Sequence, residues 1–222
     1  MRPQGRARGL LFDLDGTLFD TAPDLINSLN AVLAEQDMPP CPAHDLANSV
    51  GHGSAPMIAR AFNLTATNPR FEPLRTRFVE IYSERICEKT TAFAGIEPLL
   101  SELDQSNRPW GIVTNKPGWL TRPLIAELGY SERPACVVTG DDIALRKPHP
   151  HQVIEGCRRL DMQPGDCVVI GDAERDIQAG RSAGTLTLAA LWGYLCGDDH
   201  ASRWGADGLV EQPQDILHWL AQ

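Results

Sequence analysis

Residues 8–20 read Arg-Gly-Leu-Leu-Phe-Asp-Leu-Asp-Gly-Thr-Leu-Phe-Asp, and this stretch decides the fold. The apolar run at 10–12 predicts a short strand buried on both faces of a parallel sheet. The run ends in Asp13 and Asp15, and a turn at Gly16 can bring both carboxylates around one small volume. Ligands bind beyond the carboxyl ends of such strands, and paired carboxylates repel unless a cation or shared proton relieves them. The stretch therefore predicts a divalent metal site that contains a nucleophile.

Two simpler interpretations compete with a metal site at these acids. Acidic residues before a glycine are common in turns, so a plain turn remains open on this stretch alone. A calcium-binding loop that starts at Asp13 needs glycine at its sixth position and glutamate at its twelfth. Here Gly16 is fourth and Asp24 is twelfth, which excludes the calcium loop.

The composition restricts the classes of partner and the cellular setting. The chain has 222 residues, a net charge of −9 and a pI of about 5.1, which argues against a nucleic-acid or anionic membrane surface. No segment is long and apolar enough to cross a bilayer, and no secretory signal is recognisable. The six cysteines include no Cys-x-x-Cys pair. We therefore expect a cytoplasmic protein.

The region after the first strand is predicted to be helical. Apolar residues recur at helical spacing in three stretches: 21–36, 54–62 and 71–88. Thr21 and Asp24 suggest a capping box at the start of the first. A parallel crossover needs only a short connection, so this long helical segment predicts an inserted cap over residues 20–89.

The rest of the chain alternates between strand and helix patterns. Short strand patterns occur at 110–114, 135–139, 167–170, 185–191 and 208–210, with helical patterns between them. Such alternation predicts an α/β fold with a doubly wound, Rossmann-like parallel sheet and right-handed crossovers. We expect residues 1–19 and 90–222 to form this catalytic core.

Several predicted strand ends carry reactive side chains. Thr114 and Asn115 follow the second strand, Lys147 follows the third, and Asp172 follows the fourth with Asp176 four residues later. Taken singly, each has an ordinary interpretation as a helix cap or a solvated loop charge. The fold brings all of them to one rim, which favours a shared site.

Lysine is scarce in this chain. Its 20 basic residues include only Lys89, Lys116 and Lys147, and the last two stand beside proline at strand exits. An arginine-rich protein that places lysine there indicates that a compact point charge is needed.

Four ordered motifs carry a resemblance to a known family. They are Asp13-Leu-Asp15-Gly-Thr17, Val113-Thr-Asn-Lys-Pro117, Arg146-Lys-Pro-His-Pro150 and Gly171-Asp-Ala-Glu-Arg-Asp176. This set resembles the haloacid dehalogenase superfamily, with the greatest likeness to its phosphoglycolate phosphatase group. Segments such as 110–117 and 204–207 are also similar to N-acetylmuramic acid 6-phosphate phosphatases.

The resemblance implies a role for each acid. Asp13 would attack phosphorus and form an aspartyl-phosphate, and Asp15 would act as general acid and then as general base. The resemblance also implies Mg²⁺ as cofactor, held by Asp13, the backbone carbonyl of Asp15, and Asp172. Asp176 would complete the metal site, directly or through water.

Further residues are implied to bind substrate. Thr114, Asn115 and backbone amides, including that of Gly16, would hold phosphoryl oxygens, and Lys147 would neutralise charge on them. His52 or Arg60 of the cap would meet a substrate carboxylate. The expected substrate is a small acidic phosphate monoester of the 2-phosphoglycolate type, or alternatively N-acetylmuramic acid 6-phosphate or another sugar phosphate.

Other members of the superfamily suggest rival functions. Asp15 argues against dehalogenation, and the absence of lysine from residues 21–88 argues against phosphonate cleavage through a Schiff base. A phosphohexomutase and a non-catalytic binding protein stay open. We expect a monomer or a homodimer.

Overall fold

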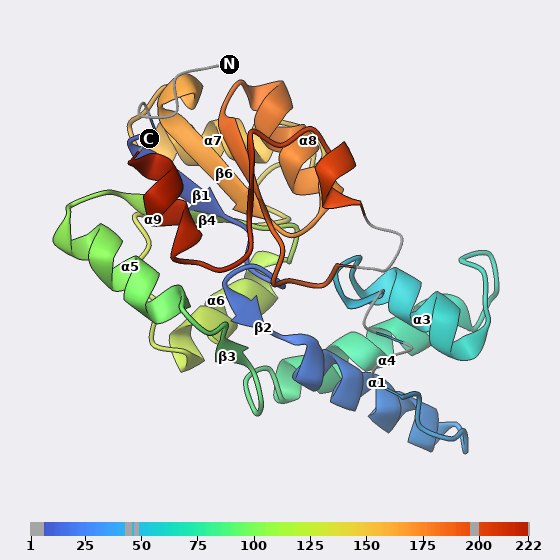
Figure 1. The fold of residues 1–222 in the computed structure, drawn as a ribbon. Coiled ribbons are helices and arrows are strands. Elements are labelled where there is room, and N and C mark those ends of the chain that lie inside the picture. Colours follow the sequence, from blue (N-terminus) through green and yellow to red (C-terminus); the bar gives the residue numbers. More distant parts are fainter. Residues whose placement is uncertain (1–6, 43–45, 47–48, 196–199, 222) are drawn as a thin grey trace. The chain divides into compact units, whose positions relative to one another are not determined.

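The computed structural model describes residues 7–42, 46, 49–195 and 200–221, and it divides into two compact units (Figure 1). One unit comprises Met1–Phe19 and Ala92–Gln222, and the other comprises Asp20–Thr91. The chain passes between them twice. At these passages β2 (Phe19–Asp20) pairs with β3 (Thr91–Ala92) in a two-stranded sheet.

The larger unit is built on a parallel sheet, which confirms the predicted α/β fold. Its strands, within the described residues, are β1 (Gly9–Phe12), β4 (Trp110–Val113), β5 (Cys136–Val138), β6 (Cys167–Gly171), β7 (Leu186–Ala190) and β8 (Gly208–Val210). Their order is β5-β4-β1-β6-β7-β8, and every neighbouring pair is parallel. The order runs in opposite directions on either side of β1, so β1 and its neighbours form the switch point where ligands bind.

Helices cover both faces of this sheet. α7 (His151–Arg159) and α8 (Glu174–Ala183) pack on one face, where Leu11, Val113 and Val169 share one apolar cluster. On the other face Phe12 meets Trp110 edge to face at 6.2 Å between ring centroids. The Trp110 indole donates a hydrogen bond to Asp104 of α5 (Ile96–Gln105). The sheet is therefore buried on both sides, as its apolar strands predict.

The described residues of the larger unit include two further α-helices. They are α6 (Gly118–Glu127), which follows β4, and α9 (Asp215–Leu220), near the end of the chain. Across the described residues, no helix combines the length and apolarity that a membrane crossing requires.

The smaller unit is helical. It contains α1 (Ala22–Glu35), α3 (Ser54–Phe62) and α4 (Phe71–Glu84), and each packs against the other two. α3 has the predicted bounds. α4 ends at Glu84 rather than at residue 88, because Arg85 leaves the helical conformation with φ −129° and ψ 37°.

The predicted capping box at the start of α1 is wrong. Thr21 makes no side-chain capping bond, since its backbone is already in the right-handed helical region. The buried Asp24 carboxylate instead accepts hydrogen bonds from the backbone N–H groups of Lys89 and Thr90 and from the Thr90 hydroxyl, at 2.7 to 3.0 Å. Asp24 therefore ties the first turn of the helical unit to its last residues.

Candidate active site

The candidate site lies at the carboxyl ends of the three central strands. Asp13 follows β1, Thr114 follows β4 and Asp172 follows β6. The Asp13 N–H donates to the carbonyl of Ile170 at 2.9 Å, so the backbone stays in register with β6 up to the acid. The parallel sheet therefore places polar groups separated by more than 150 residues at one edge.

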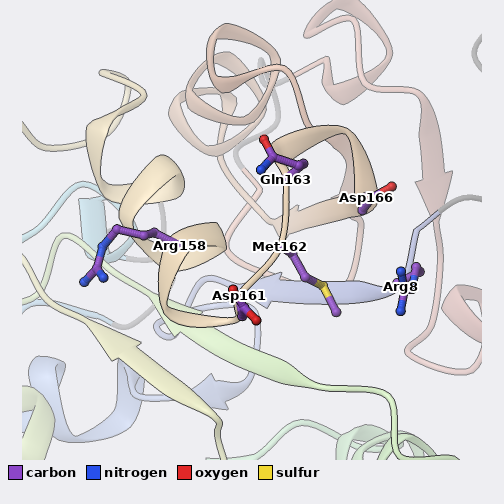
Figure 2. A pocket seen from close by; sticks show the side chains of 6 residues that line it. All are labelled: Arg8, Arg158, Asp161, Met162, Gln163 and Asp166. Atoms are coloured by element: carbon purple, nitrogen blue, oxygen red, sulfur yellow. The ribbon is translucent and has the colours of Figure 1, made fainter.

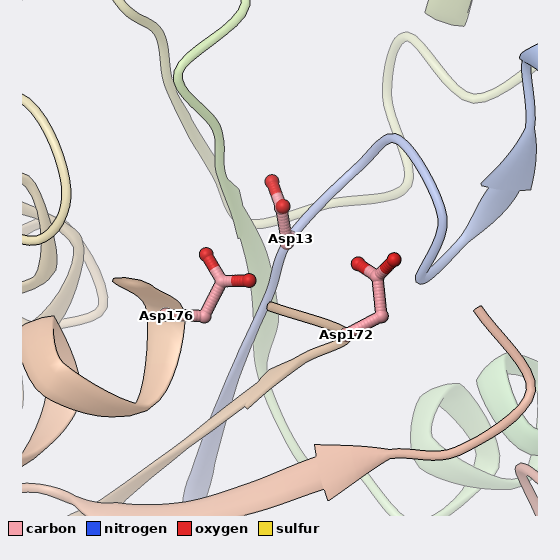
Figure 3. Close-up of side chains that lie close together, drawn as sticks. All are labelled: Asp13, Asp172 and Asp176. Atoms are coloured by element: carbon pink, nitrogen blue, oxygen red, sulfur yellow. The ribbon is translucent and has the colours of Figure 1, made fainter. Parts of the chain in front are cut away.

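Three carboxylates gather at this edge. An oxygen from each of Asp13, Asp172 and Asp176 lies within 4.8 Å of the other two, and the residues are 0 to 4% exposed. Figure 3 shows Asp13 between Asp172 and Asp176, the last of which projects from the first turn of α8. Three buried carboxylates this close form a site that attracts a cation.

The charges of this cluster act on one another. Burial, followed by the negative charges of Asp13 and Asp176, raises the pKa of Asp172 from 3.8 to about 7. Burial and the Asp13 charge likewise raise the pKa of Asp176. Carboxylate oxygens are the ligands that Mg²⁺ and similar hard cations prefer, and a divalent cation would relieve this repulsion. The residues therefore fit a divalent metal ion.

Lys147 contacts two carboxylates of the acidic cluster. Its Nζ atom lies 2.9 Å from Asp13 Oδ1 and 2.7 Å from Asp176 Oδ1, and it donates a hydrogen bond to the carbonyl of Val113. Burial opposes the lysine charge, but the carboxylates of Asp13 and Asp176 outweigh it and raise the pKa of Lys147. The two carboxylates therefore favour the ammonium form of Lys147.

A second cation near the cluster was not singled out from the sequence. Arg175 Nη2 lies 4.0 Å from Asp13 Oδ2. Burial opposes the guanidinium charge, but Asp176, Asp13 and Asp172 outweigh it and raise the pKa of Arg175. Its place within the motif at 171–176 was the available indication, but arginine is too common in this chain to stand out.

The turn after β1 supports Asp172. The Thr17 hydroxyl and the Tyr194 N–H each donate to the Asp172 carboxylate at 2.9 Å. Gly16 adopts φ +86°, and a Cβ atom there would lie 2.1 Å from Asp172 Oδ2. The position therefore requires glycine both for its backbone conformation and for the space beside the carboxylate.

A hydrogen-bonded network holds the loop that carries Lys147. The Asn115 side chain donates to the Lys147 carbonyl at 2.9 Å and accepts from its N–H at 3.0 Å. The buried Gln152 accepts from the same N–H at 2.9 Å and donates to the carbonyls of Thr114 and Thr139 at 3.0 and 2.9 Å. Sequence reasoning missed Gln152, because a glutamine in a helical pattern carries no distinguishing feature.

The remaining predicted residues fall into two groups. Asp15 lies on the turn beside Gly16, and the Thr114 hydroxyl accepts a hydrogen bond from the backbone N–H of residue 116. His52 and Arg60 belong to the helical unit, where both are exposed: His52 lies before the N-cap residue of α3, and Arg60 lies in the last turn of that helix. Their proposed contact with substrate stays a prediction.

A separate pocket of about 280 Å³ opens at the opposite edge of the sheet (Figure 2). Its lining residues are Arg8, Arg158, Asp161, Met162, Gln163 and Asp166. Arg8 and Asp166 precede β1 and β6, and their backbones are hydrogen-bonded at 2.7 Å. This pocket therefore lies at the amino ends of the strands, away from the acidic cluster.

The fold and the acidic cluster agree with comparisons to known proteins. Residues 10–190 match the family described as haloacid dehalogenase-like hydrolase. The chain belongs to this family, as the four motifs predicted.

Individual relatives within this family are phosphatases. The chain is 42% identical over 209 residues to a phosphoglycolate phosphatase of Xanthomonas campestris pv. campestris strain 8004, covering 94% of each chain. It is 38% identical over 215 residues to an N-acetylmuramic acid 6-phosphate phosphatase of Pseudomonas aeruginosa, covering 97% of this chain and 95% of that protein. The crystal structure of a predicted phosphoglycolate phosphatase from Haemophilus somnus 129PT shares the fold, with a TM-score of 0.85, 24% identity and full coverage of both chains.

Proposed function

We propose that this protein is a Mg²⁺-dependent phosphatase that hydrolyses a small acidic phosphate monoester of the 2-phosphoglycolate type. The observation that carries this proposal is the buried cluster of Asp13, Asp172 and Asp176, with the Lys147 ammonium paired to Asp13 and Asp176. A nucleophilic carboxylate, a cation site and a fixed positive charge are the groups that phosphoryl transfer needs in one place.

The metal would be held by Asp13, the backbone carbonyl of Asp15 and Asp172, with Asp176 supporting the site directly or through water. When bound, Mg²⁺ would neutralise and orient the phosphoryl oxygens. The three clustered carboxylates and the raised pKa of Asp172 support this assignment. We also propose that Asp13 is the nucleophile, because it follows the central strand β1 at the switch point of the sheet and the Lys147 Nζ atom lies 2.9 Å from its Oδ1 atom.

The proposed reaction has two steps. In the first, an Asp13 oxygen forms a bond to phosphorus, the phosphorus–ester oxygen bond breaks, and Asp15 gives its proton to the departing oxygen. In the second, water attacks phosphorus and loses a proton to the Asp15 carboxylate, while the bond to Asp13 breaks and phosphate is released. One carboxyl group serves both steps because each step leaves it in the state that the other requires.

The proposed phosphoryl contacts come from the same rim. Thr114, Asn115 and the backbone N–H groups beside them would donate to the oxygens, and Lys147 would stabilise their charge. The Gly16 N–H already donates to the Phe19 carbonyl at 3.0 Å, so the proposed contribution of Gly16 is the space that it leaves beside Asp172. The Asn115 side chain already bonds the Lys147 backbone on both of its polar atoms. Its proposed contribution to phosphate is therefore through its backbone, with the side chain holding Lys147 in place.

The relatives support a phosphate ester that also carries a carboxylate. The relative at 42% identity is named a phosphoglycolate phosphatase, which favours 2-phosphoglycolate as the substrate. The relative at 38% identity is named for N-acetylmuramic acid 6-phosphate, the second candidate. We propose that the helical residues 20–89 form a cap over the core residues 1–19 and 90–222, and that His52 or Arg60 meets the substrate carboxylate. We further propose a cytoplasmic monomer or homodimer.

A phosphate-release screen tests the proposal. Purified protein is assayed with 2-phosphoglycolate, N-acetylmuramic acid 6-phosphate and several hexose phosphates, each with Mg²⁺ and again with excess EDTA. We expect the highest kcat/KM for 2-phosphoglycolate and loss of turnover in EDTA. Phosphoryl transfer between sugar positions with little free phosphate would indicate a mutase, and substrate binding without turnover would indicate a binding protein.

A further inference from the structure

Lys116 forms a second lysine–aspartate pair at the candidate site. Its Nζ atom lies 2.9 Å from Asp15 Oδ1, although the two residues are 101 positions apart in the chain. The Lys116 side chain is 6% exposed and the Asp15 side chain 22%. One of only three lysines in the chain is thus turned inward onto the carboxylate that we propose as general acid and base.

Backbone hydrogen bonds hold Lys116 in its loop. The Lys116 N–H donates to the Thr114 hydroxyl at 3.1 Å, and the Lys116 carbonyl accepts from the Gly140 N–H at 2.8 Å and from the Thr121 hydroxyl at 3.3 Å. These bonds connect Lys116 to Thr114 after β4, to α6 and to the loop after β5. These bonds therefore fix the backbone of Lys116, from which the side chain extends to Asp15.

Asp15, by contrast, lies in a tight turn. It forms an isolated bridge with Phe19, and the Gly16 N–H donates to the Phe19 carbonyl at 3.0 Å. These bonds fix the backbone of the turn. They do not set the torsion angles of the Asp15 side chain, which depend on the contacts of the carboxylate itself. The ion pair with Lys116 is a contact that constrains the direction of the carboxylate.

We propose that Lys116 is a positioning residue, which holds the Asp15 carboxyl group where it can exchange a proton with the ester oxygen and then with water. This inference rests on the proposed phosphatase function. A misdirected acid weakens proton transfer, which contributes typically 10²- to 10⁴-fold in rate. A purely structural ion pair would affect folding but would not discriminate between leaving groups.

Leaving groups provide the test. An alkyl phosphate such as 2-phosphoglycolate needs a proton on its departing oxygen, whereas p-nitrophenyl phosphate releases a stable phenolate without one. We expect Lys116→Met to lower kcat/KM for 2-phosphoglycolate by about 10²-fold and for p-nitrophenyl phosphate by about threefold or less. Activation of water by Asp15 should also slow, so this variant should show a burst of about one equivalent of p-nitrophenol.

Three further variants make the comparison specific. Lys116→Arg should recover part of the alkyl phosphate activity, because guanidinium can keep the ion pair. Asp15→Asn should reproduce the discrimination between the two substrates more strongly. Lys89→Met, which changes an exposed lysine of the helical unit, should leave both substrates unaffected.

The outcomes separate this inference from the proposed function. Wild-type protein that hydrolyses neither substrate, nor any ester in the screen, overturns both. If wild-type protein is active and Lys116→Met lowers kcat/KM equally for the two substrates, changes only KM, or changes nothing, the positioning role is overturned alone. Thermal unfolding with saturating Mg²⁺ identifies a variant that fails to fold, and Lys116→Gln then takes its place in the same comparison.

Discussion

The two ends of the parallel sheet both carry charges of both signs, but they bury them differently. At the carboxyl ends, Lys147 and Asp176 are 4% and 0% exposed. At the amino ends, Arg158 and Asp161 of the pocket in Figure 2 are exposed to solvent. Replacement of a buried ion pair by apolar residues is often neutral or stabilising, so a fold gains little by keeping one. Stability does not account for the buried charges at the carboxyl ends, so we attribute them to function.

The largest effect is expected from a substitution that removes the nucleophile at the carboxyl ends of the strands. Asp13→Asn keeps the size of the side chain but removes the attacking carboxylate, so we expect kcat to fall by ~10⁴-fold or more. Phosphate release with Mg²⁺ present measures it. Asp161→Asn, at the exposed end, is the matched control and should keep wild-type activity; equal losses in both variants would contradict the distinction between the ends.

Removal of the central ammonium should affect both activity and stability. Lys147→Met leaves the carboxylates of Asp13 and Asp176 without their shared cation, so we expect a loss of about 3–5 kcal/mol in the free energy of unfolding. Urea unfolding in EDTA measures this loss, and Mg²⁺ should restore part of it. We expect Lys89→Met to change the free energy of unfolding by about 0.5 kcal/mol or less; a similar change in both variants would show that the buried pair contributes nothing special.

The raised pKa of Asp172 predicts that the stability of the buried end depends on pH. Its folded pKa of about 7 lies above the ordinary value of 3.8, so the folded protein holds this proton more tightly than the unfolded chain does. The metal-free protein should therefore lose stability as pH rises from about 4 through 7. At about pH 8, Asp172→Asn should be more stable than wild type by about 2–4 kcal/mol, and the difference should shrink towards about pH 4.

Urea unfolding in EDTA across this pH range measures the difference, and Mg²⁺ provides the control. Because a metal binds the deprotonated carboxylate, added Mg²⁺ should stabilise wild type but not the variant. Apparent Mg²⁺ affinity should fall about tenfold per pH unit below about pH 7. An affinity that is independent of pH would show that Asp172 does not lose a proton on metal binding.

The smallest effect is expected at the exposed end. Arg158→Ala removes an ion pair with Glu155 that lies on the surface, at 2.7 Å. Such pairs contribute about 0–1 kcal/mol, so both the free energy of unfolding and kcat should stay close to wild type. A loss of activity in this variant would assign a function to the pocket at the amino ends.

The strands and the acids at their ends were predictable from the sequence, because both depend on local pattern. Residues 10–12 and 167–170 are continuous apolar runs, and Asp13 and Asp172 follow them closely. The topology of a parallel sheet then places strand ends together, whatever their separation in the chain. The fold was therefore accessible from hydrophobic pattern and alternation alone.

The contacts between these residues were not predictable in the same way. The pairing of Asp15 with Lys116 joins loops 101 residues apart, and Asp24 bonds Lys89 and Thr90 instead of capping its own helix. Side-chain direction in loops depends on the final backbone, which local pattern does not encode. Propensity identified the turn and the helix start, but tertiary structure decided which partner each carboxylate took.

The three hydrogen bonds of the Gln152 side chain also matter for redesign of the protein. Its single side-chain amide bonds the backbone at Lys147, Thr114 and Thr139, so it acts as a spacer that sets the separation of three loops at once. Lengthening any one of these loops by a residue would disturb the other two. Redesign of this protein for a new ester should therefore leave that triple junction untouched and vary the chain elsewhere.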